Sequence, residues 1–346
     1  MANRNHIPTG NRPLQVKDSL RAIALLSGGL DSMLAIRILQ NQGIHVEALN
    51  FQTVFTCCKD TAAQAARALG VQLTVVGQED DYVDLIKNPQ HGYGKGANPC
   101  VDCRIYMFQR AKKFMEDENA HMVISGEVVG QRPMSQKRTD LDLIARAAGL
   151  EDLLLRPLSA KRLRPTRSER DGWVDRDQLY DFCGRSRKGL IALAEEFGFR
   201  DIPTPSTGCS LTEKSFAGKV HDLVQVDPSS QPWDFELLNV GRHFRKDERT
   251  KFVVGRNAEE NETLNRMWGA PDARSPTLLR PENFKGPSVI LVGAPSPAAL
   301  EYGCGLIMRY ANQGFPTPPL VAVRTDGSER LIEARSSPDA ELASTL

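Results

Sequence analysis

The sequence lacks several features that would assign it to a common protein class. No apolar run approaches the roughly 18–20 residues of a transmembrane helix, and residues 1–19 contain no apolar segment typical of a secretion signal. The 44 Lys and Arg residues balance 43 Asp and Glu residues, so a formal charge of +1 gives no global field that attracts nucleic acid. Seven cysteines in 346 residues are too few for a disulfide scaffold, and their odd number favours reduced thiols. We therefore expect a cytoplasmic protein without membrane contact.

The first half of the sequence contains a regular alternation of short apolar runs and amphipathic segments. Strands are expected at residues 22–26, 45–51, 71–76, 122–125 and 153–155. Helices are expected around residues 34–39 and at residues 60–69, 105–118 and 139–148. Strands that alternate with helices of this length indicate βαβ units. The expected fold class is α/β, a doubly wound parallel sheet covered by helices on both faces.

The first expected strand runs directly into the turn Ser-Gly-Gly-Leu-Asp-Ser at residues 27–32. Its two glycines let the backbone approach a phosphate closely, and the amides that open the next helix then face the anion. A carboxylate fits beside phosphate where it caps the turn or binds Mg²⁺. The turn is neither a Walker motif nor a dinucleotide fingerprint. The candidate nucleotide-binding residues are Ser27, Gly28, Gly29, Asp31 and Ser32.

Two segments of the sequence resemble a known enzyme family. Residues 27–32 resemble the PP-loop of ATP pyrophosphatases, which split ATP into pyrophosphate and an adenylylated substrate. Residues 125–136, with the Leu-Arg-Pro-Leu at 155–158, resemble a stretch of the tRNA 4-thiouridine synthetases. The resemblance implies an adenine nucleotide alpha hydrolase-like fold that uses ATP and Mg²⁺. It also implies three residues near the nucleotide: Gly126, Glu127 and Gln131.

Three cysteines stand apart from the others. Cys100 and Cys103 share one Cys-x-x-Cys turn, a spacing at which two thiols can share a metal or form a redox pair, and Cys209 lies in a Pro- and Gly-containing loop. Together these segments resemble the cysteine segments of tRNA 2-thiouridylases. The favoured interpretation is a [4Fe–4S] cluster held by all three thiolates, with one iron open to hydrosulfide. A persulfide pair of Cys103 with Cys209 is a second interpretation. A zinc site, which would need His91 as a further ligand, is a third interpretation.

The second half of the sequence carries local positive charge. Residues 156–190 hold ten Lys and Arg against five acids, and the dense run at 161–170 is expected to be a loop that contacts a phosphate backbone. Residues 237–246 and 251–262 resemble an NFACT-R type of RNA-binding domain. Strands at 234–240, 251–254, 288–292 and 320–323, with a helix at 297–312, predict a smaller α+β domain.

These observations divide the chain into five parts. We expect a flexible N-terminus at 1–19, a PP-loop ATP pyrophosphatase domain at 20–200, and a cysteine-bearing loop and hinge at 201–232. An NFACT-R-like RNA-binding domain at 233–325 and a disordered tail at 326–346 follow.

The resemblance implies a tRNA sulfurtransferase that adenylylates a uridine and replaces its carbonyl oxygen with sulfur, giving 4-thiouridine. Its catalytic residues would be Asp31, Cys100, Cys103 and Cys209, its partners tRNA, ATP and a sulfur donor (sulfide or a cysteine desulfurase). A homodimer is compatible with this interpretation. Three alternatives stay open: 2-thiouridine synthesis by a persulfide mechanism, an amide-forming ATP pyrophosphatase of small molecules, and a non-catalytic RNA-binding protein.

Overall fold

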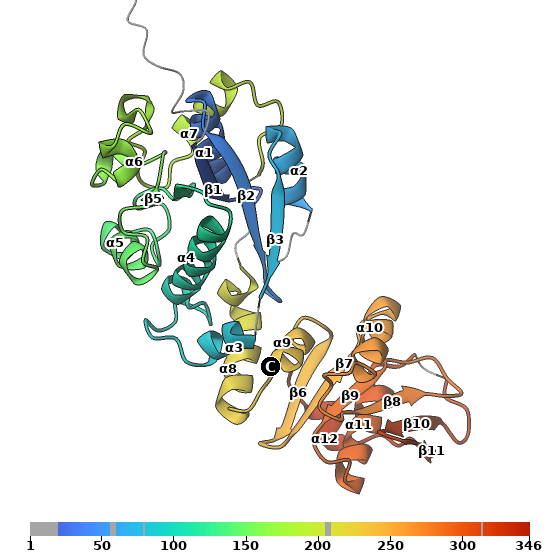
Figure 1. Ribbon diagram of the computed structural model, residues 1–346. Coiled ribbons are helices and arrows are strands. Elements are labelled where there is room, and N and C mark those ends of the chain that lie inside the picture. The colour runs from blue at the N-terminus through green and yellow to red at the C-terminus, as the bar shows by residue number, and fades with distance from the viewer. Residues whose placement is uncertain (1–19, 56–59, 79, 205–208, 313) are drawn as a thin grey trace, which may run out of the picture. The chain divides into compact units, whose positions relative to one another are not determined.

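The computed structural model describes residues 20–55, 60–78, 80–204, 209–312 and 314–346, which fall into two compact units (Figure 1). The first unit is built from the chain up to residue 78 together with 90–92 and 99–208. The second contains residues 79–89, 93–98 and 209–346, so two short segments from the first half of the chain belong to it. No helix in the described part of the chain is long and apolar enough to span a bilayer.

A five-stranded parallel sheet forms the centre of the first unit, as predicted. The strand order is β3-β2-β1-β4-β5. The chain therefore moves outward from β1 to β3 and then continues on the other side of β1. This reversal makes the gap between β1 and β4 the switch point at which ligands of such sheets bind. The strands are β1 (Arg21–Leu25), β2 (His45–Gln52), β3 (Leu73–Gly77), β4 (Met122–Ile124) and β5 (Leu154–Leu155).

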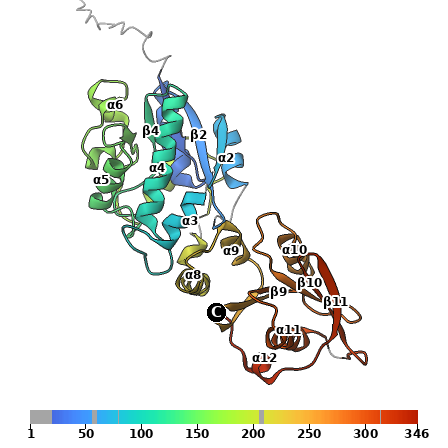
Figure 2. The same cartoon turned by 60° about the horizontal axis from the view of Figure 1, so that its bottom comes forward.

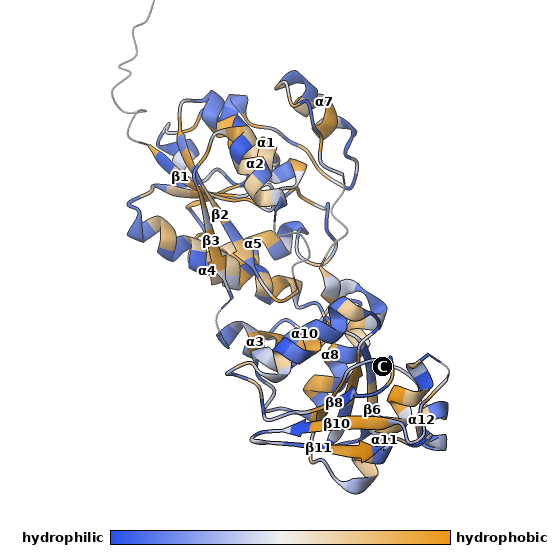
Figure 3. Ribbon diagram, turned by 90° about the vertical axis from the view of Figure 1, so that its right-hand side faces the viewer, coloured by the Kyte–Doolittle hydropathy of each residue, from blue (hydrophilic) through white to orange (hydrophobic). Residues whose placement is uncertain are grey.

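Helices cover both faces of this sheet. Ala22 and Ala24 of β1 pack on the side of α1 (Leu30–Asn41), α2 (Thr61–Leu69) and α7 (Lys188–Glu196). Ile23 points to the opposite face, which α4 (Cys100–Asp117) and α5 (Arg138–Ala147) cover (Figure 2). Hydrophobic and hydrophilic residues alternate along α4, as expected of a helix with one buried face (Figure 3). Burial on both faces explains why the central strands β1 and β4 consist largely of apolar residues.

The segment that follows β5 is more structured than the sequence indicated. Residues 161–170 were predicted to form a loop, but part of that segment is helical. It carries the end of the turn η2 (Ala160–Arg162) and the short helix α6 (Arg167–Arg170), and the turn η3 (Arg176–Gln178) follows. The helix α6 begins at a capping box in which Thr166 and Glu169 satisfy each other's backbone amides.

A six-stranded antiparallel sheet forms the centre of the second unit, in the order β11-β10-β8-β9-β7-β6. Phe252 and Val254 of β7 pack against α11, whereas Val253 faces α9 and α10. The strands are β6 (Arg242–Asp247), β7 (Thr250–Val254), β8 (Thr277–Pro281), β9 (Val289–Val292), β10 (Leu320–Thr325) and β11 (Ser328–Glu333). The helical elements are α3 (Asp80–Lys87), η4 (Ser210–Thr212), α8 (Lys214–Val226), α9 (Pro232–Leu237), α10 (Ala258–Trp268), α11 (Pro297–Tyr310) and α12 (Pro338–Leu342).

Two predictions about this unit were wrong. Residues 326–346 are not a disordered tail, because β11 pairs along its whole length with β10 and α12 packs on α11. An edge strand leaves most of its side chains exposed, so its polar composition does not preclude pairing. Residues 234–240 do not form a strand. They lie largely in α9, which starts with Pro232 and a capping box between Gln231 and Asp234.

A buried lysine makes the second unit sensitive to pH. Lys251 on β7 is only 4% exposed, and burial lowers its pKa from 10.5 to about 8. Because the unfolded chain keeps that proton to higher pH, stability should rise as pH increases through this window. We expect Lys251→Met to raise the free energy of unfolding at pH 7 by about 3 kcal/mol. We also expect the variant to lose most of the increase in stability that the wild-type protein shows above pH 8. Urea unfolding of wild type and variant at pH 7 and pH 10 measures the stability difference and its pH dependence. Identical pH dependence in the two proteins would show that Lys251 does not have a lowered pKa.

Candidate nucleotide site and cysteine turn

The turn after β1 is shaped by its glycines. Gly28 has a positive φ of 81°, and a Cβ there would lie 2.6 Å from the carbonyl carbon of Thr61 at the start of α2. Gly29 is the N-cap of α1 and places no side chain over the amides that open the helix. Ser32 donates a hydrogen bond to the Gly29 carbonyl at 2.8 Å. The first turn of a 12-residue helix is thus presented at the carboxyl edge of the sheet, where an anion fits.

The segment after β4 contacts this turn directly. A Cβ on Gly126 would come within 2.5 Å of the Ser32 amide nitrogen and closer still to the carbonyl of Asp31. Only glycine allows two backbones to approach so closely. The two sequence segments singled out as nucleotide-binding therefore meet at the switch point between β1 and β4.

Asp31 is held in place by its neighbours. Gln131 donates from Nε2 to Asp31 Oδ2 at 3.0 Å. Burial raises the pKa of the Asp31 carboxyl, and this effect is opposed by the Gln131 hydrogen bond and by the positive charges of Arg187 and Arg132. The structure gives Oδ1 no hydrogen-bond partner among the described residues. An oriented carboxylate oxygen beside the turn predicted to bind phosphate fits Mg²⁺, which combines one or two carboxylates with phosphate oxygens.

Glu127 has a different environment from that of a ligand-facing carboxylate. It is 3% exposed and accepts a hydrogen bond from Arg156 Nε at 2.9 Å. Its other oxygen lies 3.7 Å from Arg104 Nε and has no hydrogen-bond partner within the described residues. Glu127 therefore joins β4, β5 and α4 beneath the site. Sequence reasoning missed Arg104 and Arg156 as its partners, because both are distant in the chain.

The Cys-x-x-Cys turn lies in the same unit. Cys100 and Cys103 occupy the first turn of α4, which starts five residues earlier than the predicted helix at 105. Both thiols are partly exposed, and Arg104 links this turn to Glu127. His91 contacts Asp102 Oδ1 through Nδ1 at 2.9 Å, an arrangement that orients the ring and is compatible with a metal at Nε2.

Cys209 belongs to the second unit, where it precedes η4. The loop residues 205–208 lie outside the described residues, as do Cys57 and Cys58. Across the ranges that the structure describes, no three His, Cys, Asp or Glu side chains are grouped to hold a metal ion. Two partly exposed thiols in one helical turn fit two positions of a cluster, and the three-thiolate site stays a prediction.

Half of the ten basic residues at 156–190 are paired with carboxylates within the fold. Arg156 pairs with Glu127 at 2.9 Å, Arg170 with Asp152 at 2.7 Å, and Arg176 with Glu169. Arg162 and Arg167 also have carboxylate partners, Asp181 and Asp171. The local excess of positive charge in the sequence therefore overstates the charge available for a phosphate backbone. Arg187, which was counted in this run, instead acts on Asp31.

The fold and the turn after β1 define a nucleotide-binding α/β domain of the PP-loop type. Residues 18–162 match the family described as "Thiamine biosynthesis protein (ThiI)", and residues 241–344 match "NFACT protein RNA binding domain". The chain thus combines a PP-loop domain of the ThiI family with a domain of the NFACT RNA-binding family, as the resemblance implied.

Curated relatives match the first part of the chain. The "tRNA-specific 2-thiouridylase MnmA" of Petrotoga mobilis is 29% identical over 31% of this chain and 35% of its own length. The protein of that name from Trichlorobacter lovleyi is 27% identical over 42% of this chain and 44% of its own length. The chain therefore aligns with less than half of either relative.

Two solved structures each align with 62% of the chain. One is described as a "predicted subunit of tRNA methyltransferase" from Methanocaldococcus jannaschii, with a TM-score of 0.37, 16% identity and 91% of that chain covered. Another is a "4-thiouridine synthetase - RNA complex with bound ATP", with a TM-score of 0.36, 19% identity and 53% coverage of that chain.

Proposed function

We propose that this protein is an ATP-dependent tRNA sulfurtransferase that converts a uridine to 4-thiouridine. The observation that carries the proposal is the contact of Gly126 with the backbone of Asp31 and Ser32, which joins the two nucleotide-binding segments at the switch point of the sheet. The ThiI family match of residues 18–162 supports the same assignment. The relatives named as tRNA-specific 2-thiouridylases support tRNA as the substrate.

The geometry suits adenylylation of a carbonyl oxygen. The phosphates of ATP bind at the amides that open α1, with Gly28 and Gly29 giving access and Ser27 and Ser32 supplying hydroxyls. The uridine oxygen attacks the α-phosphorus, the bond to the β-phosphate oxygen breaks, and pyrophosphate leaves. Mg²⁺ at Asp31 would neutralise charge on the phosphates. The amides of the turn stabilise the leaving pyrophosphate because they are oriented before the reaction begins.

Sulfur transfer completes the reaction at the base. A sulfur nucleophile attacks the adenylylated carbon, and AMP departs with the former carbonyl oxygen. A [4Fe–4S] cluster held by Cys100, Cys103 and Cys209 would supply that nucleophile. The sulfur source would be sulfide, or a cysteine desulfurase whose persulfide sulfur a thiol reductant first reduces to sulfide. The Cys100–Cys103 turn at the start of α4 supports this assignment, because Arg104 ties the turn to Glu127. In the persulfide alternative, Cys103 and Cys209 carry the sulfur and the product is 2-thiouridine.

The second unit would recruit tRNA. Its residues 241–344 match an RNA-binding domain, and the ion pairs of residues 156–176 leave less free positive charge in the first unit than its sequence indicated. Both observations favour the second unit as the part that holds RNA.

Asp31→Asn is expected to abolish tRNA-dependent pyrophosphate release and to leave the protein at least as stable as wild type at pH 7. Burial raises the pKa of Asp31 in the folded state, so its stabilising contribution is present below the unfolded pKa and is lost as pH rises through the folded pKa. At pH 7 the ionised carboxylate opposes folding, and a neutral amide removes that penalty while still accepting from Gln131.

A pyrophosphate assay and thermal unfolding at pH 7 test both parts of this prediction. Wild-type turnover in the variant would remove Asp31 from the mechanism. A clear fall in melting temperature would show that the carboxylate is structural.

A further inference from the structure

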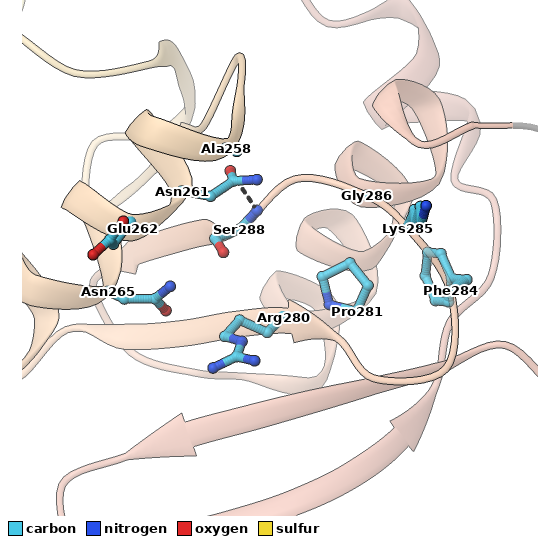
Figure 4. Close-up of a pocket in the computed structure, with 10 residues that line it drawn as sticks. All are labelled: Ala258, Asn261, Glu262, Asn265, Arg280, Pro281, Phe284, Lys285, Gly286 and Ser288. Carbon is cyan, nitrogen blue, oxygen red and sulfur yellow. Dashed lines mark hydrogen bonds between the residues drawn. The ribbon is translucent and has the colours of Figure 1, made fainter.

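A pocket of about 370 Å³ lies within the second unit, between α10 and the segment that leads from β8 to β9 (Figure 4). Its volume is within the range of about 300–1,000 Å³ that is typical of ligand sites. Residues of α10 form one wall, and the end of β8 with the following segment forms the other. The side chains that matter here are Asn261, Glu262, Asn265, Arg280, Phe284 and Lys285.

The two cations of this pocket differ from neighbouring arginines in having no acidic partner. Arg245, Arg256 and Arg274 each hold a carboxylate at 2.5 Å. The side chains of Arg280 and Lys285 make neither an ion pair nor a hydrogen bond within the described residues. Their charge is therefore available to a ligand. Since Glu262 contributes one negative charge, the pocket has a formal charge of +1, which suits a phosphodiester better than a free polyphosphate.

Two asparagines that line the pocket carry amide groups without a hydrogen-bond partner among the described residues. Asn265 Oδ1 is buried and has no hydrogen-bond partner among the described residues. Asn261 Oδ1 accepts from the Ser288 amide at 2.9 Å, which fixes the side chain and leaves its Nδ2 donors without a partner in the part of the chain that the structure describes. An acceptor and a donor on the same helix match the edge of a nucleobase, which offers N–H groups beside carbonyl or ring-nitrogen acceptors.

We propose that this pocket binds one unstacked nucleotide of single-stranded RNA. Arg280 and Lys285 contact phosphates of the strand, Asn261 and Asn265 read the base edge, and Phe284 supplies an aromatic surface at the pocket wall. This inference rests on the proposed function because it takes RNA as the ligand. It adds the position on the second unit where the RNA strand binds.

Fluorescence anisotropy with the full chain and a labelled 12-nucleotide single-stranded RNA tests the proposal. The double variant Arg280→Ala, Lys285→Ala should weaken binding at least about tenfold and lower the salt slope by about 1.4, since each phosphate contact contributes about 0.7 on single strands. Asn265→Ala should weaken binding about 2- to 10-fold. The melting temperature of Asn265→Ala should not fall, because the oxygen removed has no hydrogen-bond partner among the described residues.

Arg249→Ala is the matched control. Arg249 is exposed in the β6–β7 turn, and its guanidinium has no carboxylate partner among the described residues. The RNA affinity of this variant should stay within about twofold of the wild-type value.

Equal losses for Arg249→Ala and the double variant would overturn the proposal in favour of diffuse electrostatic binding. Equal affinity for a duplex of the same sequence, or for free AMP, would overturn the assignment of an unstacked nucleotide within a strand. The assay contains neither ATP nor a sulfur source, so it is independent of thiolation. Pocket-dependent RNA binding without any thiolation would refute the proposed function alone, whereas thiolation with unchanged RNA affinity in the pocket variants would refute this inference alone.

Discussion

Gly126→Ala should reduce ATP-dependent thiolation by at least about 100-fold. The added methyl group would lie 2.5 Å from the Ser32 amide nitrogen and closer to the Asp31 carbonyl. Both neighbours are backbone, so no side-chain rotation can relieve the clash, and the turn at residues 27–32 has to move. Overpacking of this kind also costs about 1–3 kcal/mol of stability. Pyrophosphate release and urea unfolding measure the two effects separately.

Gly77→Ala is the matched control for this substitution. Gly77 ends β3 in the same sheet, and no atom lies within 4 Å of the position that its Cβ would take. It should therefore retain activity. If Gly126→Ala stayed as active as Gly77→Ala, the segment after β4 would not shape the nucleotide site. The contact of Gly126 with Asp31 and Ser32 would then no longer support the proposed function.

Single alanine substitutions of Cys100, Cys103 and Cys209 should each abolish thiolation, and iron should be lost together with activity. A cluster held by two thiolates is poorly retained, so the three variants should behave alike. Iron analysis and absorbance of anaerobically purified protein measure retention. Cys183→Ala is the control, because Cys183 is an exposed thiol outside the proposed site. This variant should keep both its iron content and its thiolation activity.

The alternatives for the cysteines predict other patterns. A persulfide mechanism makes Cys103 and Cys209 essential while Cys100 only adjusts the reactivity of its neighbour. A zinc site predicts bound metal without colour and a loss of stability rather than of chemistry. Activity retained by Cys209→Ala alone would contradict both the cluster and the persulfide pair.

The α/β unit could be predicted from sequence because its strands are buried on both faces. An apolar run such as the one that follows Arg21 in β1 (Arg21–Leu25) predicts a buried strand when amphipathic helices flank it. The second unit was harder to predict. In α9 the run of apolar residues near Leu237 suggested a strand, although Pro232 and the capping box were signals of a helix start. In β11 the exposed side chains hid a strand that is stabilised by pairing with β10.

The candidate site was predictable to the extent that its residues are contiguous in sequence. The turn at 27–32 carries its own chemical signal, whereas the segment at 125–136 was found by its resemblance to the 4-thiouridine synthetases. The arginines around them could not be assigned, because the carboxylate that each one meets depends on the tertiary fold: Arg156 pairs with Glu127, whereas Arg187 acts on Asp31. The same limit explains why residues 156–190 appeared more basic in sequence than they are in the structure.

The most direct test of the central claim is mass spectrometry of nucleosides from tRNA incubated anaerobically with the protein, ATP, Mg²⁺ and sulfide. We predict that 4-thiouridine appears, that its formation requires ATP, and that AMP and pyrophosphate form in amounts equal to it. Unmodified uridine throughout, with the cluster reconstituted and ATP consumed, would contradict the assignment of this protein as a tRNA sulfurtransferase.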